Sequence, residues 1–219
     1  MNRRILGWAV VAALALTAVG AVVSPSAWAS KGIHNFGGYS APVVAAASAT
    51  ITVPAANTIS CSSPKAATID MWVALTRGQY AANAGFNVQC VHGSPIMFLS
   101  GAAGTLSFRF PVFAGDVISV TVSESAAATI VTAQDMTTTV SDSANSLGTT
   151  ATTPTVVQFG ATAISKTLPV FGPVTYSSIT VDGAPIDSST VTSRNLTRSH
   201  PPNVLPGPLS SGSFTLTET

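Results

Sequence analysis

Few residues of this 219-residue chain are of the types that do acid–base, nucleophilic or metal chemistry. Charged residues make up only 8% of the sequence, with 8 acidic residues and 3 histidines. The interval between Asp142 and Asp182 contains no Asp or Glu. Serine is abundant, but no Gly-x-Ser-x-Gly nucleophile motif occurs. The sequence therefore gives little support to Ser/His/Asp catalysis.

Three titratable residues are prominent by their context, and each has an ordinary structural explanation. Asp70 lies close before Trp72 at the start of a predicted strand, where an aspartate is commonly exposed. Asp116 is expected to be a turn residue whose side chain accepts a hydrogen bond from its own backbone. His92 is expected to be a solvated turn residue rather than a base or a metal ligand. None of them is predicted to be catalytic.

The chain has 2 cysteines, Cys61 and Cys90, and such a pair in an exported chain predicts a disulfide. The bridge would close a loop that contains Trp72 and Asn83. A metal site would need more ligands than two sulfurs and a few scattered histidines supply. We therefore predict neither a metal nor another cofactor; the histidines are His34, His92 and His200.

The first 29 residues have the order of parts that an export signal requires. Arg3 and Arg4 precede an apolar run over residues 5–23, and an Ala-x-Ala cleavage sequence ends at Ala29. We predict a bacterial-type signal helix over residues 1–29 that is cleaved, with retention as a membrane anchor as the alternative. Cleavage predicts a secreted protein, either extracellular or associated with the cell envelope, without stable membrane insertion.

The rest of the chain is nearly neutral. Removal of residues 1–29 takes away two of nine basic residues and none of eight acidic ones, which leaves one more acid than base. Such a chain attracts neither nucleic acid nor an anionic membrane. About 190 residues is an ordinary length for one domain. We therefore predict a single domain over residues 30–219, present as a monomer.

Short alternating runs rich in β-branched residues recur along this domain, with Gly, Pro, Asn and Asp between them. No segment between residues 45 and 219 has sustained helical spacing with caps. The pattern predicts an all-β antiparallel sandwich. Residues 142–154 and 201–212 are predicted to be exposed loops. The predicted strands are residues 48–54, 69–75, 85–91, 106–111, 117–123, 129–133, 137–141, 156–159, 174–181 and 213–217.

Seven short segments, read in order, resemble the eqolisin (glutamic peptidase) family from about residue 35 to the C-terminus. Residues 72–75, Trp-Val-Ala-Leu, are similar to the family's Trp-Val-Gly-Leu. Residues 90–95, Cys-Val-His-Gly-Ser-Pro, resemble the Cys-x-Asn-Gly-x-Pro turn of its bacterial members. The resemblance implies a secreted protein with a concanavalin-like β-sandwich. The other segments are residues 36–39, 49–54, 111–122, 171–176 and 209–215.

The activity of that family rests on a Gln and a Glu, which together activate a water molecule and stabilise the oxyanion. The resemblance places Asn83 at the Gln position, with Gly85 matching the family's Gly, and it places Gly160 at the Glu position. An Asp of the family is replaced by Thr76, and its Trp-Tyr-Glu segment by Leu-Ser-Gly at residues 99–101. The resemblance therefore implies a degenerate bacterial-type member without the catalytic pair.

Three functions are compatible with these patterns. The first is a non-catalytic pseudo-peptidase with a binding or cell-surface role, which holds an extended peptide or a glycan in a sheet groove. The second is an acid-acting glutamic endopeptidase with a displaced site, in which Gln79 or Gln89 replaces the missing Gln. The third is a structural envelope protein without an open groove. The candidate groove residues are Trp72, Tyr80, Asn83 and Gln158, although an aromatic on a strand more often packs in the core.

Overall fold

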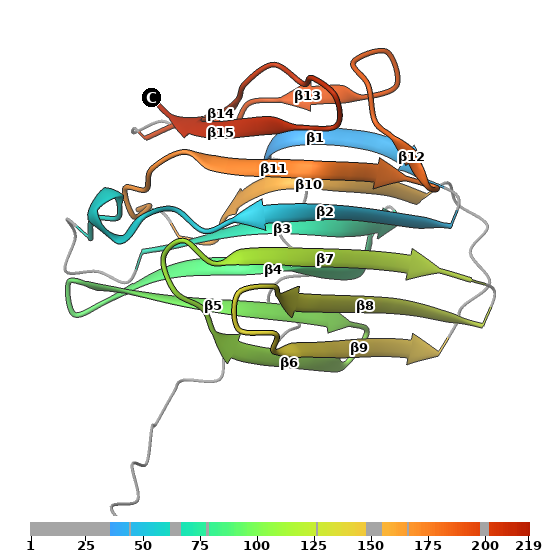
Figure 1. Cartoon of the computed structure of the whole chain (residues 1–219), viewed down its shortest axis with the longest axis horizontal. Helices are drawn as coiled ribbons and strands as arrows, with labels where there is room; N and C mark the ends of the chain where they lie inside the picture. The colour runs from blue at the N-terminus through green and yellow to red at the C-terminus, as the bar shows by residue number, and fades with distance from the viewer. Residues whose placement is uncertain are drawn as a thin grey trace, which may run out of the picture.

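The computed structural model describes residues 36–43, 45–61, 67–77, 79–125, 127–147, 155–165, 167–197 and 202–219. These residues form two antiparallel sheets that lie face to face (Figure 1). Sheet A has seven strands in the order β13-β1-β10-β3-β4-β5-β6. Sheet B has eight, in the order β14-β15-β11-β2-β7-β8-β9 with β12 paired to β11. The predicted all-β antiparallel sandwich is confirmed, whereas the predicted signal helix lies outside the described residues.

The strands have 2 to 13 residues and follow one another closely along the chain. Those of sheet A are β1 (Phe36–Val43), β3 (Thr68–Arg77), β4 (Gln79–Val91), β5 (Ser94–Ala103), β6 (Leu106–Pro111), β10 (Thr155–Ala163) and β13 (Thr192–Arg194). Those of sheet B are β2 (Ala46–Thr52), β7 (Val117–Glu124), β8 (Ala128–Asp135), β9 (Ser141–Leu147), β11 (Val174–Val181), β12 (Ala184–Pro185), β14 (Val204–Pro206) and β15 (Phe214–Glu218). Within the described ranges the one helical element is the 3-10 turn η3 (Ala56–Thr58), and no helix is long and apolar enough to cross a membrane.

The two sheets share one core because each strand turns alternate apolar side chains inward. In β3 these side chains are Ile69, Met71, Val73 and Leu75, each of which is 0% exposed. Their removal from water supplies the main driving force for folding. The intervening residues of β3 lie on the opposite side, which is the outer face of sheet A.

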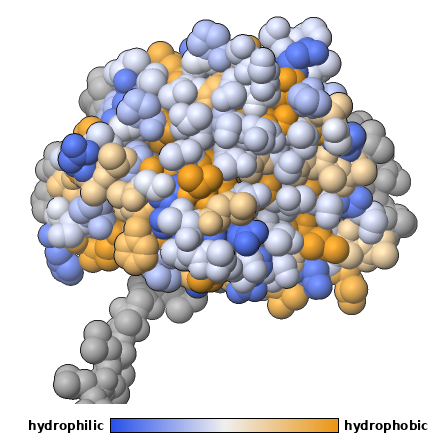
Figure 2. All heavy atoms as spheres, in the orientation of Figure 1, coloured by the Kyte–Doolittle hydropathy of each residue, from blue (hydrophilic) through white to orange (hydrophobic). Residues whose placement is uncertain are grey.

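The surface of the sandwich is covered largely by small polar side chains. On the face drawn in Figure 2, hydrophobic residues are scattered among hydrophilic ones rather than gathered in one patch. In β7 of sheet B, for example, the outward positions alternate with buried apolar ones and include Ser119, Thr121 and Ser123. This composition explains how a chain with 8% charged residues still presents a polar surface.

Tyr176 of β11 connects the two sheets through the core. Its side chain is 0% exposed, and its hydroxyl donates a hydrogen bond of 2.7 Å to the carbonyl oxygen of Gly160 in β10. The ring of Phe214 stacks on that of Tyr176 with centroids 4.8 Å apart. Burial raises the pKa of the Tyr176 hydroxyl, which therefore stays protonated and remains a donor. This hydrogen bond holds β10 of sheet A to β11 of sheet B on the core side.

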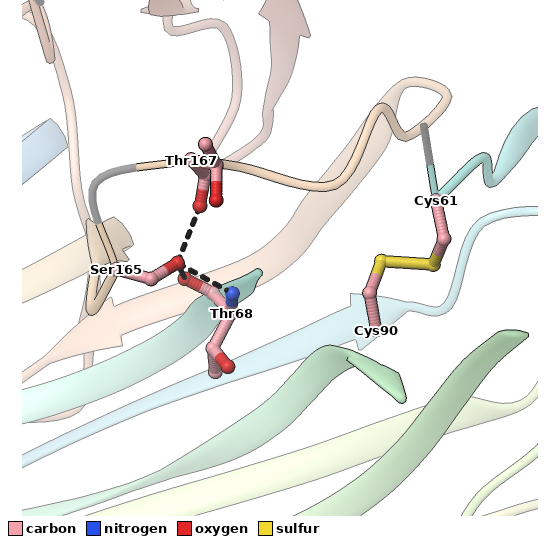
Figure 3. The surroundings of a disulfide bond; sticks show 5 residues. All are labelled: Cys61, Thr68, Cys90, Ser165 and Thr167. Atoms are coloured by element: carbon pink, nitrogen blue, oxygen red, sulfur yellow. Dashed lines mark hydrogen bonds between the residues drawn. A yellow bond between two sulfur atoms is a disulfide. The ribbon is translucent and has the colours of Figure 1, made fainter. Parts of the chain in front are cut away.

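The predicted disulfide between Cys61 and Cys90 is confirmed (Figure 3). It joins the segment after η3 to the end of β4, with the two Cα atoms 5.5 Å apart. A bridge that closes a loop of this length typically adds about 3 to 4 kcal/mol to stability. Close by in the same view, Ser165 accepts a hydrogen bond of 2.7 Å from the backbone N–H of Thr68 and contacts the carbonyl oxygen of Thr167.

The strand predictions omitted β1 and β5 of sheet A and failed again around β9 of sheet B. Residues 137–141 were predicted as a strand, but residues 136–138 form a turn in which the Asp135 carboxylate accepts hydrogen bonds from the backbone N–H groups of Thr137 and Thr138. Residues 142–147, predicted as loop, belong to the edge strand β9, which pairs through its backbone with β8. Such an edge strand needs little apolar content, because in it only Ala144 is buried. In the second predicted loop, β14 is a short strand.

Candidate functional site

The outer face of sheet A carries the chain's unusual polar residues, and the strand register arranges them in rows across the sheet. Residues that are directly paired on neighbouring antiparallel strands have Cβ atoms about 5 Å apart. We name each row by its residue on β10 or β3. The Gln158 row is Ser40, Gln158, Ala74, Asn83 and Ala102; the Gly160 row is Gly38, Gly160, Trp72, Gly85, Ser100 and Arg109; the Asp70 row is Phe36, Thr162, Asp70, Asn87 and Phe98.

Three of the predicted groove residues share this face. Asn83 and Gln158 are 5% and 6% exposed and belong to one row, in which Ala74 lies between them. Trp72 is half-buried and lies in the next row. Tyr80 lies on β4 opposite Thr76, but its side chain is outside the described residues, as is that of Gln79. The sheet thus brings Trp72, Asn83 and Gln158 together.

Gly160 has no room for a side chain. A Cβ atom built on it would lie 2.2 Å from the carbonyl oxygen of Gly37, 2.8 Å from the Cα of Gly38 and 2.8 Å from the ring of Phe36. Its partner Gly38 is equally confined, because a Cβ there would lie 2.1 Å from the carbonyl oxygen of Phe159. The backbones of β1 and β10 therefore meet at a glycine pair. A carboxylate at position 160 would require these strands to separate.

The other replaced positions are structural as well. Thr76, where the resemblance expects an Asp, donates a hydrogen bond of 3.2 Å from its hydroxyl to the carbonyl oxygen of Val156. Leu99 is 0% exposed and belongs to the core. Ser100 belongs to the outer face, where its hydroxyl donates to the Oδ1 of Asn87 at 3.4 Å. Neither Thr76 nor Leu99 brings a titratable group to the outer face.

Asp70 is the acid at the centre of this face, and the expectation that it is exposed is wrong. Its side chain is 1% exposed, and the Asn87 amide donates a hydrogen bond of 2.7 Å to its Oδ1. Burial raises the pKa of Asp70 from 3.8 to about 8, and the hydrogen bond from Asn87 offsets only part of this rise. At neutral pH the carboxyl is therefore mostly protonated. The alternation of β3 already puts Asp70 on the same face as Trp72, and that signal was available in the sequence.

Three buried polar atoms on this face have no hydrogen-bond partner among the described residues. They are Oδ2 of Asp70, Nε1 of Trp72 and Oγ1 of Thr162. Thr162 is directly paired with Asp70, and Trp72 is the next residue along β3 on the same face. A buried polar group without a partner typically costs about 1 to 3 kcal/mol. Such a concentration of unpartnered groups in one place is a reason to expect a ligand there.

Aromatic rings bound this polar cluster on both sides. Phe36 is 3% exposed and is paired with Thr162 on one side. Phe98 is paired with Asn87 on the other side, and the Arg109 guanidinium carbon lies 3.3 Å from the centroid of its ring. The cluster is therefore a short polar stretch between apolar walls, with one cation at its margin.

The remaining candidates have ordinary roles. His92 is exposed with a φ of 50°, in the turn between β4 and β5. Asp116 accepts a hydrogen bond of 2.6 Å from the backbone N–H of Phe113, as predicted for a turn residue. His34 and His200 lie outside the described residues. Within the described ranges, no group of three or more His, Cys, Asp or Glu side chains is placed to hold a metal ion.

Comparison with known proteins identifies the fold. No family model matches the sequence, and a search of curated proteins finds no match. Scytalido-glutamic peptidase, solved with a peptide-based transition-state analogue, aligns with a TM-score of 0.65 and 16% identity over 85% of this chain and 99% of that chain. The chain has the eqolisin fold. SCP-B, an eqolisin solved with the tripeptide Ala-Ile-His, gives a TM-score of 0.64 and 17% identity over the same shares of the two chains.

The eqolisin fold agrees with the resemblance that the motifs carried. At 16–17% identity the likeness concerns the fold alone, so any activity has to be argued from the residues of this chain. At the two positions where the resemblance expects the catalytic pair of an eqolisin, the chain has the buried amide of Asn83 and the side-chain-free Gly160.

Proposed function

We propose that this protein is a non-catalytic protein of the eqolisin fold, which binds an extended peptide across the outer face of sheet A after export from the cell. The observation that carries the proposal is Gly160. In the catalytic pair that the resemblance implies, the general base is a carboxylate within reach of the attacking water, and such a base typically contributes 10²- to 10⁴-fold in rate. Position 160 has no side chain and no space for one.

A peptide ligand is favoured by the known occupants of this fold and by the surface of sheet A. Two solved proteins of the fold hold a peptide-based analogue and a tripeptide. Here, Trp72 is half-buried, and its neighbours in the row, Gly85 and Gly160, have no side chains. A flat aromatic side chain beside bare backbone suits an extended chain, because it offers apolar contact at a small loss of side-chain freedom.

A displaced catalytic site is the alternative, and one observation favours it. Asp70 and Asn87 form a carboxyl–carboxamide pair on the same face. However, a pKa of about 8 leaves Asp70 protonated throughout the acid range, where it could not accept a proton from water. Its free oxygen is also buried. The pair therefore suits hydrogen bonding better than acid proteolysis.

The test uses the full chain, expressed with its own residues 1–29, and a fluorescently labelled protein that has been unfolded by reduction and alkylation. We expect the exported protein to begin at Ser30, to cleave none of the substrate between pH 2 and 7, and to bind it saturably. Trp72→Ala should weaken binding at least about tenfold, because it removes the central aromatic contact. Thr121→Ala, at an exposed site on sheet B, is the matched control and should bind as wild type does.

Cleavage by the wild-type chain that Asp70→Asn abolishes would establish the displaced site and overturn the proposal. Absence of binding to any unfolded protein would also overturn it. A free N-terminus other than Ser30, or a chain that stays in the membrane, would contradict the export part alone.

A further inference from the structure

The unpartnered atoms of Asp70, Thr162 and Trp72 differ in whether they can donate a hydrogen bond, accept one or do both. The indole N–H of Trp72 is only a donor, whereas the Thr162 hydroxyl can donate and accept. The protonated Asp70 carboxyl can also do both through its free oxygen. One bound group that satisfies all three must contain an acceptor for the indole N–H, and a group that also contains a donor can use the accepting capacity of the Asp70 and Thr162 oxygens as well.

A carboxamide has this composition. Its carbonyl oxygen has two lone pairs, which can accept from the Trp72 indole and from the Asp70 carboxyl, and its NH₂ group can donate to the Thr162 hydroxyl. It is also uncharged, which matters because the side chain of Asp70 is 1% exposed and that of Thr162 is 8% exposed. An ionised group in such surroundings would lose its hydration without a paired opposite charge.

One of the two aromatic walls fits the same group. Phe36 is paired with Thr162, so the methylene carbons of a Gln or Asn side chain would contact its ring while the amide reaches the polar stretch, whereas Phe98 lies four strand spacings from Phe36, about 19 Å away, and would contact another part of the peptide. Arg109, the cation at this margin, is already engaged over the ring of Phe98. The row therefore offers an apolar surface to the methylene carbons of such a side chain and a polar surface to its amide group.

Trp72 gives the route to the buried atoms. It is the partly exposed member of the cluster, and its two neighbours in the row are glycines. A Cβ on Gly85 would meet only backbone among its nearest atoms, at Met71 and Trp72. The indole therefore has no side chain beside it on β4 at this position, and a group that reaches Asp70 would have to displace the indole.

We propose that Asp70, Trp72 and Thr162 form a subsite that recognises the side-chain carboxamide of a Gln or Asn residue in the bound peptide. The inference rests on the proposed peptide-binding function and adds its specificity. Nothing in the subsite requires cleavage, because its atoms only donate and accept hydrogen bonds.

The experiment compares two capped hexapeptides, Ala-Ala-Gln-Ala-Ala-Ala and Ala-Ala-Leu-Ala-Ala-Ala, by titration calorimetry against the full chain. Uniform alanine elsewhere lets each peptide slide until its distinctive side chain reaches the subsite. We expect the Gln peptide to bind about tenfold more tightly than the Leu peptide, because an apolar side chain leaves the buried polar groups unpaired. In a Trp8→Phe, Trp28→Phe background Trp72 is the one tryptophan left, so its fluorescence reports binding at the site.

Conservative variants separate recognition from folding. Trp72→Phe keeps a ring but removes the N–H, and Thr162→Val keeps the shape but removes the hydroxyl. Each should reduce the Gln-to-Leu ratio to about threefold or less, and the ratio is the readout because any general loss of peptide binding affects both peptides alike. Thr132→Val, an exposed site on sheet B, should leave the ratio unchanged.

The outcomes distinguish the two proposals. If both peptides bind wild type equally, or if the preference persists in both variants, the carboxamide subsite is wrong and peptide binding stands. If neither peptide binds, the proposed function is wrong and the subsite fails with it. Binding of an oligosaccharide such as cellohexaose in place of the peptides would also overturn both, in favour of a glycan ligand.

Discussion

The outer faces of the two sheets carry polar residues at the same alternate positions, but only one of these faces buries them. On sheet B, Thr121, Thr132 and Ser143 are paired in register and are exposed to solvent. On sheet A, Asp70 and Asn87 are paired in register with exposures of only 1% and 7%. The two faces have the same alternating sequence pattern, but these polar residues are exposed to solvent on sheet B and buried on sheet A.

The difference matters because burial changes the chemistry of a polar group. A hydroxyl on sheet B exchanges hydrogen bonds with water or with a neighbour, as Ser48 and Thr180 do at 2.8 Å. A carboxyl on sheet A cannot do this, so its pKa rises and its lone pairs need protein or ligand partners. Residues that are unfavourable for stability are retained more readily where they bind something. The burial of polar groups on the outer face of sheet A therefore supports the proposed binding role of that face.

Of the substitutions that test the difference between the two faces, Asp70→Asn should have the largest effect on stability. Folding raises the pKa of Asp70 from 3.8 to about 8, so between these values the folded state keeps a proton that the unfolded state has released. The contribution of Asp70 to stability is therefore fully present below about pH 4 and is lost as the pH rises to about 8. About four pH units at roughly 1.4 kcal/mol per unit set an upper limit on the order of 5 kcal/mol.

The measurement is urea unfolding of both proteins at pH 4, 6 and 8. Asparagine mimics the protonated acid, so the variant should match wild type at pH 4 and should be several kcal/mol more stable at pH 8. Asp187→Asn is the matched control. Asp187 is exposed and its pKa is lowered by hydrogen bonds from Ser189, so this change should give no such gain at pH 8. A constant difference between wild type and Asp70→Asn at all pH values would contradict the buried acid.

The fold could be predicted from the sequence further than the site could. Alternation located the strands at 106–111 and 174–181 with their observed bounds, because their inward residues are apolar and their ends are marked by Gly or Pro. The same rule failed for β1 and β9, where small and polar residues form strands only because neighbouring strands supply backbone hydrogen bonds.

Asp70 shows why the site was harder to predict. Its face followed from the alternation of β3, but its neighbours across the sheet come from residues far along the chain, such as Thr162, which only the sheet order brings near. The loss of a carboxylate at Gly160 was visible in the motif, whereas the lack of room for one follows from the close approach of β1 to β10. The burial of Asp70 and the lack of room at Gly160 both depend on tertiary contacts, so no local sequence pattern predicts them.

Gly160→Ala should give the next largest effect. The added methyl group would overlap the carbonyl oxygen of Gly37 and the ring of Phe36, and the backbone atom cannot turn aside as a side chain can. We expect a loss of about 3 kcal/mol in the free energy of unfolding, at the upper end of the usual range for overpacking. Urea unfolding followed by circular dichroism measures it.

Gly207→Ala is the control for this change, because a Cβ there would lie 3.2 Å from the nearest atom, the carbonyl oxygen of Thr215. It should change stability by less than about 1 kcal/mol. A Gly160→Ala protein as stable as Gly207→Ala would show that β1 and β10 can separate easily. In that case position 160 would have space for a glutamate, and the argument against catalysis would rest on the absence of a side chain at Gly160 alone.

Arg109→Met tests the margin of the outer face and should have the smallest effect. The guanidinium lies over the ring of Phe98, where sheet A passes from buried to exposed positions. Loss of a cation–π contact at an exposed site is expected to lower the free energy of unfolding by about 0.5 to 1 kcal/mol. Arg109→Lys keeps the charge but not the flat surface, so its loss should be intermediate. Equal stability of all three proteins in urea would mean that Arg109 does not hold the Phe98 ring, and the apolar wall beside Asn87 would then be free to move when a ligand binds.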